Sequence, residues 1–136
     1  MKFADTSWWV AWANKTDSRH SIALSLFAQL GSSEHVLTTN QVVGETWTYL
    51  NRKVGHGAAV GFVDRVEALE ANGRVQVHSV TSAQESSAWT WLRRHDERAY
   101  SFVNATSFQV MRDRRLREAL AFDQDFAVAG FIELRP

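Results

Sequence analysis

Short apolar segments alternate along the chain with longer segments whose apolar residues recur at helical spacing. Over Arg19–Leu30 the helical spacing is carried by Ile22, Ala23, Leu26, Phe27 and Leu30. Gly31 follows this segment and tolerates the left-handed conformation that ends many helices. In Arg74–Val80 apolar and polar residues alternate, which predicts a strand.

The same reasoning predicts the other elements. Strands are expected over Lys2–Asp5, His35–Thr38, Arg74–Val80, Ala119–Phe122 and Phe131–Leu134. Helices are expected over Ser7–Asn14, Arg19–Leu30, from a cap at Thr39 or Asn40 to Lys53, from Gly55 to about Ala71, from a cap at Thr81 or Ser82 to Arg94, and over Phe102–Arg112. Strands separated by helices imply right-handed crossovers, and hence an α/β fold with a mainly parallel sheet of about four to five strands flanked by helices. At this length, and with its one proline at the end, we expect residues 1–136 to form a single domain.

The composition of the chain also bears on the cellular compartment in which we expect the protein. The chain has no cysteine, which excludes disulfides and thiolate metal sites and favours a reducing cytoplasm. Met1–Asp5 lacks the apolar core of a signal peptide, and no stretch approaches the roughly 20 apolar residues of a membrane span. We therefore expect a cytoplasmic protein without membrane contact. The six tryptophans are expected mostly in the core or in interfaces.

The charges balance overall but not locally. Fifteen basic and fifteen acidic residues give a net charge of zero, which argues mildly against a nucleic-acid-binding protein. The segment from Arg93 to Arg117, however, contains seven arginines and only three acidic residues, so this region is a candidate for phosphate binding. A solvated helix face with locally paired arginines is the alternative interpretation.

Three carboxylates stand where a parallel sheet would bring them together. Asp5 and Asp123 each follow a short apolar strand, and Glu45 lies near the start of the helix after the second strand. Helix capping by the two aspartates and a surface position for Glu45 are the alternatives. Clustered carboxylates without histidine or cysteine favour Mg²⁺ or Mn²⁺, and such sites serve phosphodiester cleavage.

Two other chemistries do not fit. Gly55–Gly61 is rich in glycine but follows a helix, and its spacing is wrong for a phosphate-binding loop. Phosphatases that form an aspartyl-phosphate need a second aspartate two residues after the first, where this chain has Ser7.

Four sequence blocks resemble the signature blocks of PIN-domain ribonucleases, and most closely those of VapC toxins of bacterial toxin–antitoxin pairs. The blocks are Asp5-Thr6-Ser7, Gly44-Glu45-Thr46, Ser101-Phe102-Val103-Asn104-Ala105-Thr106-Ser107-Phe108 and Phe122-Asp123-Gln124-Asp125-Phe126. The resemblance covers essentially the whole chain. It implies a PIN-like fold, with Asp5, Glu45, Asp123 and residue 104 as the catalytic residues that bind Mg²⁺ or Mn²⁺. Ser7 and Thr106 are secondary candidates for orienting ligands.

Asn104 departs from the family, which has an aspartate at this position. The amide keeps one oxygen but loses a charge. At ~5 Å and an effective dielectric constant of ~20, one charge next to a divalent ion is worth ~7 kcal/mol before desolvation is subtracted. We therefore expect this chain to be inactive or strongly impaired.

The resemblance also suggests a target and partners. The segments 45–53 and 94–98 are similar to a VapC subgroup that cuts the sarcin–ricin loop of large-subunit ribosomal RNA. The candidate RNA-binding residues are Arg52, Lys53, His56, Arg93, Arg94, His95 and Arg98. Cleavage of transfer RNA and a non-catalytic RNA-binding module are the alternatives. A homodimer is implied, together with a cognate VapB-type antitoxin whose C-terminal segment occupies the acidic groove.

Overall fold

A five-stranded parallel sheet forms the centre of the molecule in the computed structural model, which describes all 136 residues. The strands lie in the order β3-β2-β1-β4-β5, so the N-terminal strand is the middle one. Their bounds are β1 Lys2–Ala4, β2 Val36–Thr39, β3 Val75–His78, β4 Glu118–Leu120 and β5 Ile132–Glu133. The predicted α/β fold with a parallel sheet is confirmed.

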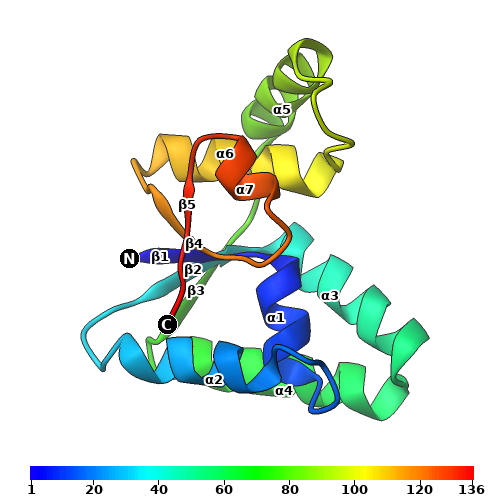
Figure 1. The fold of residues 1–136 in the computed structure, drawn as a ribbon, viewed down its shortest axis with the longest axis vertical. Helices are drawn as coiled ribbons and strands as arrows, with labels where there is room; N and C mark the ends of the chain where they lie inside the picture. Colours follow the sequence, from blue (N-terminus) through cyan, green and yellow to red (C-terminus); the bar gives the residue numbers. More distant parts are fainter.

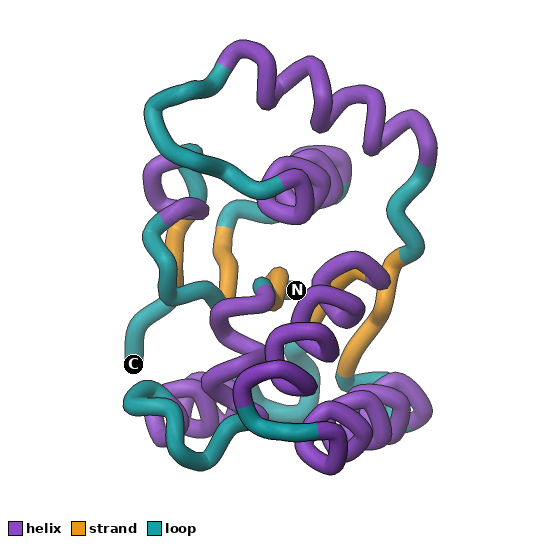
Figure 2. Tube along the Cα trace, turned by 90° about the vertical axis from the view of Figure 1, so that its right-hand side faces the viewer, coloured by secondary structure: helices purple, strands orange, loops and turns teal.

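Helices cover both faces of the sheet. They are α1 Thr6–Ala13, α2 His20–Gln29, α3 Asn40–Lys53, α4 His56–Ala71, α5 Ser82–Arg94, α6 Phe102–Asp113 and α7 Asp125–Val128. Figure 1 shows α5, α6 and α7 on one side of the sheet and α1, α2 and α4 on the other, and Figure 2 shows the same separation after a quarter turn. None of these helices has the length and apolar character needed to cross a bilayer.

Short polar side chains begin four of the helices. Asp5 caps α1, and Thr39 caps α3 by accepting a hydrogen bond from the Val42 amide. Thr81 and Ser101 each form a capping box with the residue three positions on, at the start of α5 and α6. These caps fix where each helix starts, and therefore where the side chains of its first turns lie.

Two segments of the structure differ from the elements that the sequence predicts. The strand expected over Arg74–Val80 ends at His78, and the Val80 amide donates to Asn40 Oδ1 instead of to a neighbouring strand. The segment after Asp123 forms the one-turn helix α7, preceded by Gln124 in the left-handed conformation with φ 71°. The second difference bears on the site, because the Asp125 backbone amide in this turn donates a hydrogen bond to Asp123 Oδ1 at 3.1 Å.

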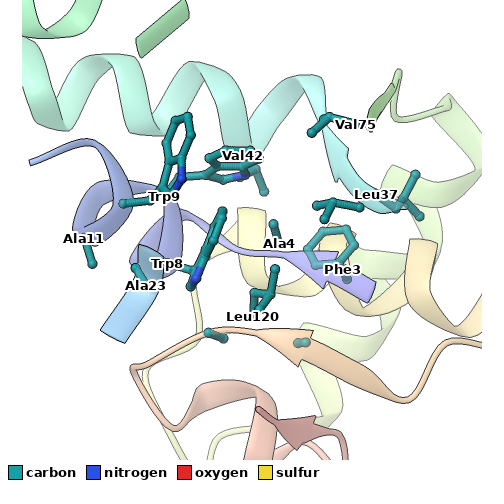
Figure 3. Packing of buried hydrophobic residues seen from close by; sticks show 14 of the residues in the cluster. Phe3, Ala4, Trp8, Trp9, Ala11, Ala23, Leu37, Val42, Val75 and Leu120 are labelled. Atoms are coloured by element: carbon teal, nitrogen blue, oxygen red, sulfur yellow. The ribbon is translucent and has the colours of Figure 1, made fainter. Parts of the chain in front are cut away.

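An aromatic cluster anchors the end of β1. Trp8 and Trp9 are fully buried, and Figure 3 shows them at the start of α1, close to residues of the sheet and Val42 of α3. Trp9 Nε1 donates to Thr38 Oγ1 at 3.2 Å, and that hydroxyl donates to the Ala4 carbonyl oxygen at 2.9 Å. This chain of bonds ties α1 to β1 and β2, so Asp5 between β1 and α1 is held by a fully buried part of the core.

Candidate active site

One cavity of about 390 Å³ lies at the carboxyl ends of the central strands. It is lined by the side chains of Asp5, Glu45, Asn104 and Asp123, which come from four separate segments of the chain. The structure therefore brings together the four residues that the sequence blocks selected. Ser7 lines the cavity as well, whereas Thr106 does not.

Asp5 is the most buried member of this group, with 1% of its surface exposed. Its Oδ2 accepts hydrogen bonds from the Ser7 amide at 3.2 Å and from Ser7 Oγ at 2.8 Å. Ser7 Oγ in turn accepts from the Phe122 amide at 3.0 Å. Ser7 thus connects Asp5 to the segment that carries Asp123, which suits the orienting role expected of it.

The second oxygen of Asp5 has no partner. Asp5 Oδ1 is buried and makes no hydrogen bond. A buried carboxylate oxygen without a donor is costly, because it has lost its water without gaining a replacement. A hard cation would supply the missing partner, and a set of carboxylate and amide oxygens is the donor set that Mg²⁺ and Mn²⁺ prefer.

The electrostatics of the cavity also favour a cation. The pKa of Asp5 is raised to about 7, first by burial and then by the negative charge of Asp123, while the hydrogen bonds from Ser7 oppose the shift. The pKa of Asp123 is raised to about 6, first by burial and then by the charges of Asp125 and Glu133. Both carboxyl groups would release their protons more readily next to a positive charge.

Asn104 lies in the first turn of α6, where only 7% of its surface is exposed. The backbone N–H of Asn104 donates to Ser101 Oγ at 2.9 Å, and the side-chain Oδ1 of Asn104 accepts from the backbone N–H of Ser101 at 3.1 Å. An aspartate oxygen would accept the same bond, and negative charge is favoured at a helix N-terminus. The fold therefore does not require an amide at this position.

Glu45 is half-buried on α3, and its carboxylate faces the same cavity. No three acidic or histidine side chains in the chain lie close enough to form a ready-made metal centre. The expected ligands share one cavity without being gathered into a closed coordination shell. Their role as metal ligands stays a prediction.

The sequence reasoning missed four polar or aromatic side chains that also line the cavity: Asp17, Arg19, Tyr49 and Asp125. Arg19 donates to the Phe122 carbonyl oxygen at 3.4 Å, and its guanidinium lies 4.9 Å from the Phe122 ring centroid. A cation from the α1–α2 loop thus reaches the acidic cavity. No local pattern marks this residue, because the loop approaches the cavity only after folding.

Arg98, whose side chain is 34% exposed, supports the turn that carries Asp123. Its Nε lies 2.7 Å from Asp125 Oδ1, and its Nη2 donates to the Asp123 carbonyl oxygen at 3.1 Å. Arg98 was predicted to bind RNA, but here its guanidinium holds the turn that carries Asp123. An RNA phosphate would have to compete with this ion pair.

The other predicted residues lie outside the cavity. Thr106 is buried and donates to Gln41 Oε1 at 2.6 Å and to the Val103 carbonyl oxygen at 3.2 Å, so it connects α6 to α3 and does not face the site. The remaining candidate RNA-binding residues do not line it either: Arg52, Lys53, His56, Arg93 and Arg94 are exposed, and His95 is half-buried. They stay predictions.

A family model described as PIN domain matches residues 2–132, so the chain belongs to the PIN-domain family. It is 51% identical over 136 residues to the 23S rRNA-specific endonuclease VapC20 of Mycobacterium tuberculosis, in strains CDC 1551 / Oshkosh and H37Rv, covering 100% of this chain and 99% of the relative. The crystal structure of M. tuberculosis VapC20, described as a sarcin–ricin loop cleaving toxin, superposes with a TM-score of 0.91 at 49% identity over 100% of both chains. The resemblance to VapC toxins is confirmed. Nucleases of this family generally depend on a divalent metal ion, and VapC toxins pair with VapB antitoxins.

Proposed function

We propose that this chain is an endoribonuclease toxin whose target is the sarcin–ricin loop of large-subunit ribosomal RNA. The observation that carries this proposal is the pair of buried Asp5 and half-buried Asp123, which follow two directly paired parallel strands, in a chain 51% identical along its length to a 23S rRNA-specific endonuclease. Ribosomal RNA as the substrate places its action in the cytoplasm. By inhibiting translation, it would act as a toxin.

Asp5, Glu45 and Asp123 are the proposed ligands of Mg²⁺ or Mn²⁺, with the oxygen of residue 104 as the fourth. The metal ion, when bound, supplies the charge that activates a water and neutralises the phosphate. Ser7 donates to Asp5 Oδ2, so Oδ1, which has no partner, would be the oxygen available to hold the ion. Arg98 holds the Asp123 turn in place. Hydrolysis would leave a 5′-phosphate and a 3′-hydroxyl.

Asn104 is expected to impair this reaction. An amide oxygen binds a divalent ion more weakly than a carboxylate, because it carries no net charge. We propose that the chain as written binds RNA but cuts it slowly or not at all. Because the capping box accepts either residue, Asn104→Asp should restore the charge without disturbing α6.

The test is cleavage by the Asn104→Asp form, with Mg²⁺, Mn²⁺ or EDTA, of intact ribosomes and of total transfer RNA. We expect one cut in the sarcin–ricin loop, dependent on metal and absent when Asp123→Asn is added. An intact loop with cut transfer RNA would change the substrate. RNA binding without any cleavage, unaffected by EDTA, would instead support a non-catalytic RNA-binding module. Cleavage by the unaltered chain at the rate of Asn104→Asp would refute the impairment.

The proposed partners follow from the same cavity. A VapB-type antitoxin could insert an arginine among the carboxylates, since guanidinium forms strong paired bonds with them. Arg19 already brings one guanidinium to this cavity. A homodimer is proposed from the family resemblance alone, and sedimentation of the purified chain would test it.

A further inference from the structure

Tyr49 is the one aromatic side chain in the lining of the acidic cavity. It lies on α3 four residues after Glu45, so the two side chains are neighbours on one face of the helix. Its surface is 44% exposed, although it borders a cavity whose other members are mostly polar or acidic. A large ring is therefore presented to whatever enters the site.

The ring of Tyr49 is also free of aromatic packing. Every other phenylalanine, tryptophan and tyrosine of the chain lies against a second aromatic ring, a histidine or an arginine guanidinium. Even Trp89, which is 49% exposed, stacks on Phe102 with ring centroids 4.3 Å apart. The face of Tyr49 is thus available for a ligand, whereas the other exposed ring is already covered.

We propose that Tyr49 stacks on a nucleobase next to the scissile phosphate, and so is a substrate-binding residue of the site. The inference rests on the proposed function, because it needs an RNA substrate in the cavity. Carboxylates that no metal ion neutralises repel the phosphodiester backbone, so the site gains from a source of affinity that does not depend on charge. Stacking on an aromatic ring supplies it, and every base has a face that can stack.

The position of the ring fits this role. Neighbours four residues apart on a helix have Cβ atoms about 5–6 Å apart, so a base stacked on Tyr49 would belong to a nucleotide close to the phosphate that a metal ion at Glu45 would hold. Stacking there would draw the adjacent base out of its own stack and open the backbone to the carboxylates. The target would then be a loop or other unpaired segment, because the bases of a regular helix are not free to stack on a protein ring.

Kinetics test the role of the ring. In the Asn104→Asp background, Tyr49→Leu, Tyr49→Phe and the control Thr48→Ala are compared on a sarcin–ricin hairpin RNA. Thr48 is exposed on the same helix but does not line the cavity. We expect Tyr49→Leu to lower kcat/KM about 5- to 150-fold, the range that the loss of one stacked base corresponds to. Tyr49→Phe and Thr48→Ala should remain within about twofold of the parent.

A spectroscopic measurement separates stacking from a structural effect. 2-Aminopurine is placed on either side of the cleavage position, and its fluorescence is followed on binding in EDTA to the chain as written. Quenching with the unaltered chain and Tyr49→Phe, lost in Tyr49→Leu, supports stacking. Equal kcat/KM and equal quenching for Tyr49→Leu would overturn the role of Tyr49 and leave the nuclease proposal standing. Failure of Asn104→Asp to bind or cut the hairpin would overturn both.

Discussion

Replacing Asp5 by asparagine should stabilise the protein at neutral and alkaline pH while abolishing its proposed chemistry. Asp5 is 1% exposed, one of its oxygens has no partner, and burial together with Asp123 raises its pKa from 3.8 to about 7. The native state therefore binds the Asp5 proton more tightly than the unfolded chain does. Asparagine keeps the acceptor that caps α1, since Asn and Asp are equally good at that position.

The size of the expected stabilisation follows from the shift in the pKa of Asp5. One pKa unit corresponds to about 1.4 kcal/mol, so a shift from 3.8 to about 7 corresponds to roughly 4 kcal/mol of native-state stability lost when Asp5 ionises. Part of this penalty is shared with Asp123, and the new amide is itself buried, so we expect a net gain of about 2 kcal/mol for Asp5→Asn. The folded pKa is raised, so the stabilising contribution of the protonated group is complete below about pH 4. It is lost as the pH rises through about 7.

Urea unfolding in EDTA at pH 4, 6 and 8, followed by tryptophan fluorescence, would measure this. The unfolding free energies of the parent and Asp5→Asn should be similar at pH 4 and separate progressively by pH 8. Adding Mg²⁺ or Mn²⁺ at pH 8 should stabilise the parent more than the variant, since a cation relieves the repulsion only where both carboxylates exist. A constant difference at all three pH values, or a variant less stable at pH 8, would refute the electrostatic reasoning.

Three further variants have defined outcomes. Asn104→Asp should tighten Mn²⁺ binding, measured by isothermal titration calorimetry, at least tenfold; unchanged affinity would show that residue 104 is not a ligand. Ser7→Ala should lower the unfolding free energy by about 1–3 kcal/mol in urea titrations, because the Phe122 amide and the Asp5 carboxylate both lose a partner; a change below about 0.5 kcal/mol would contradict this. Arg98→Gln should speed hydrogen exchange in segment 121–128 without altering that of β1–β3, since it removes the ion pair to Asp125; unchanged exchange would mean that the turn is held by other contacts.

Much of the fold could be predicted because the local sequence signals agree with the helices and strands that form. The helical spacing in 19–30, the caps at Thr39 and Thr81, and the apolar strand before Asp5 each encode an element within a few residues. The order of strands was not predicted. It depends on which apolar segments pack against each other across long sequence separations, and the hydrophobic pattern does not contain this information.

The site was predicted where chemistry and topology coincide. Asp5 and Asp123 follow parallel strands that pair directly, so their convergence could be expected from the pattern. Arg19 and Tyr49 could not be placed in this way, because one lies in a loop and the other on a helix face that has no apolar signal. Thr106 was assigned to the site from its closeness to Asn104 in sequence, but two residues along a helix turn the side chain about 200° away.

The place of β1 in the middle of the sheet has a consequence for the timing of activity during synthesis. β1 needs β4 on one side, and β4 together with the turn after it comes from residues 118–125, more than 110 residues after Asp5. Until these residues have emerged from the ribosome, the nascent chain has Asp5 outside it. It then lacks both the strand β4 that pairs with β1 and the side chain of Asp123. The cavity is thus completed only after residues 118–125 have left the ribosome, so the proposed enzyme cannot attack the ribosome that is making it before that point.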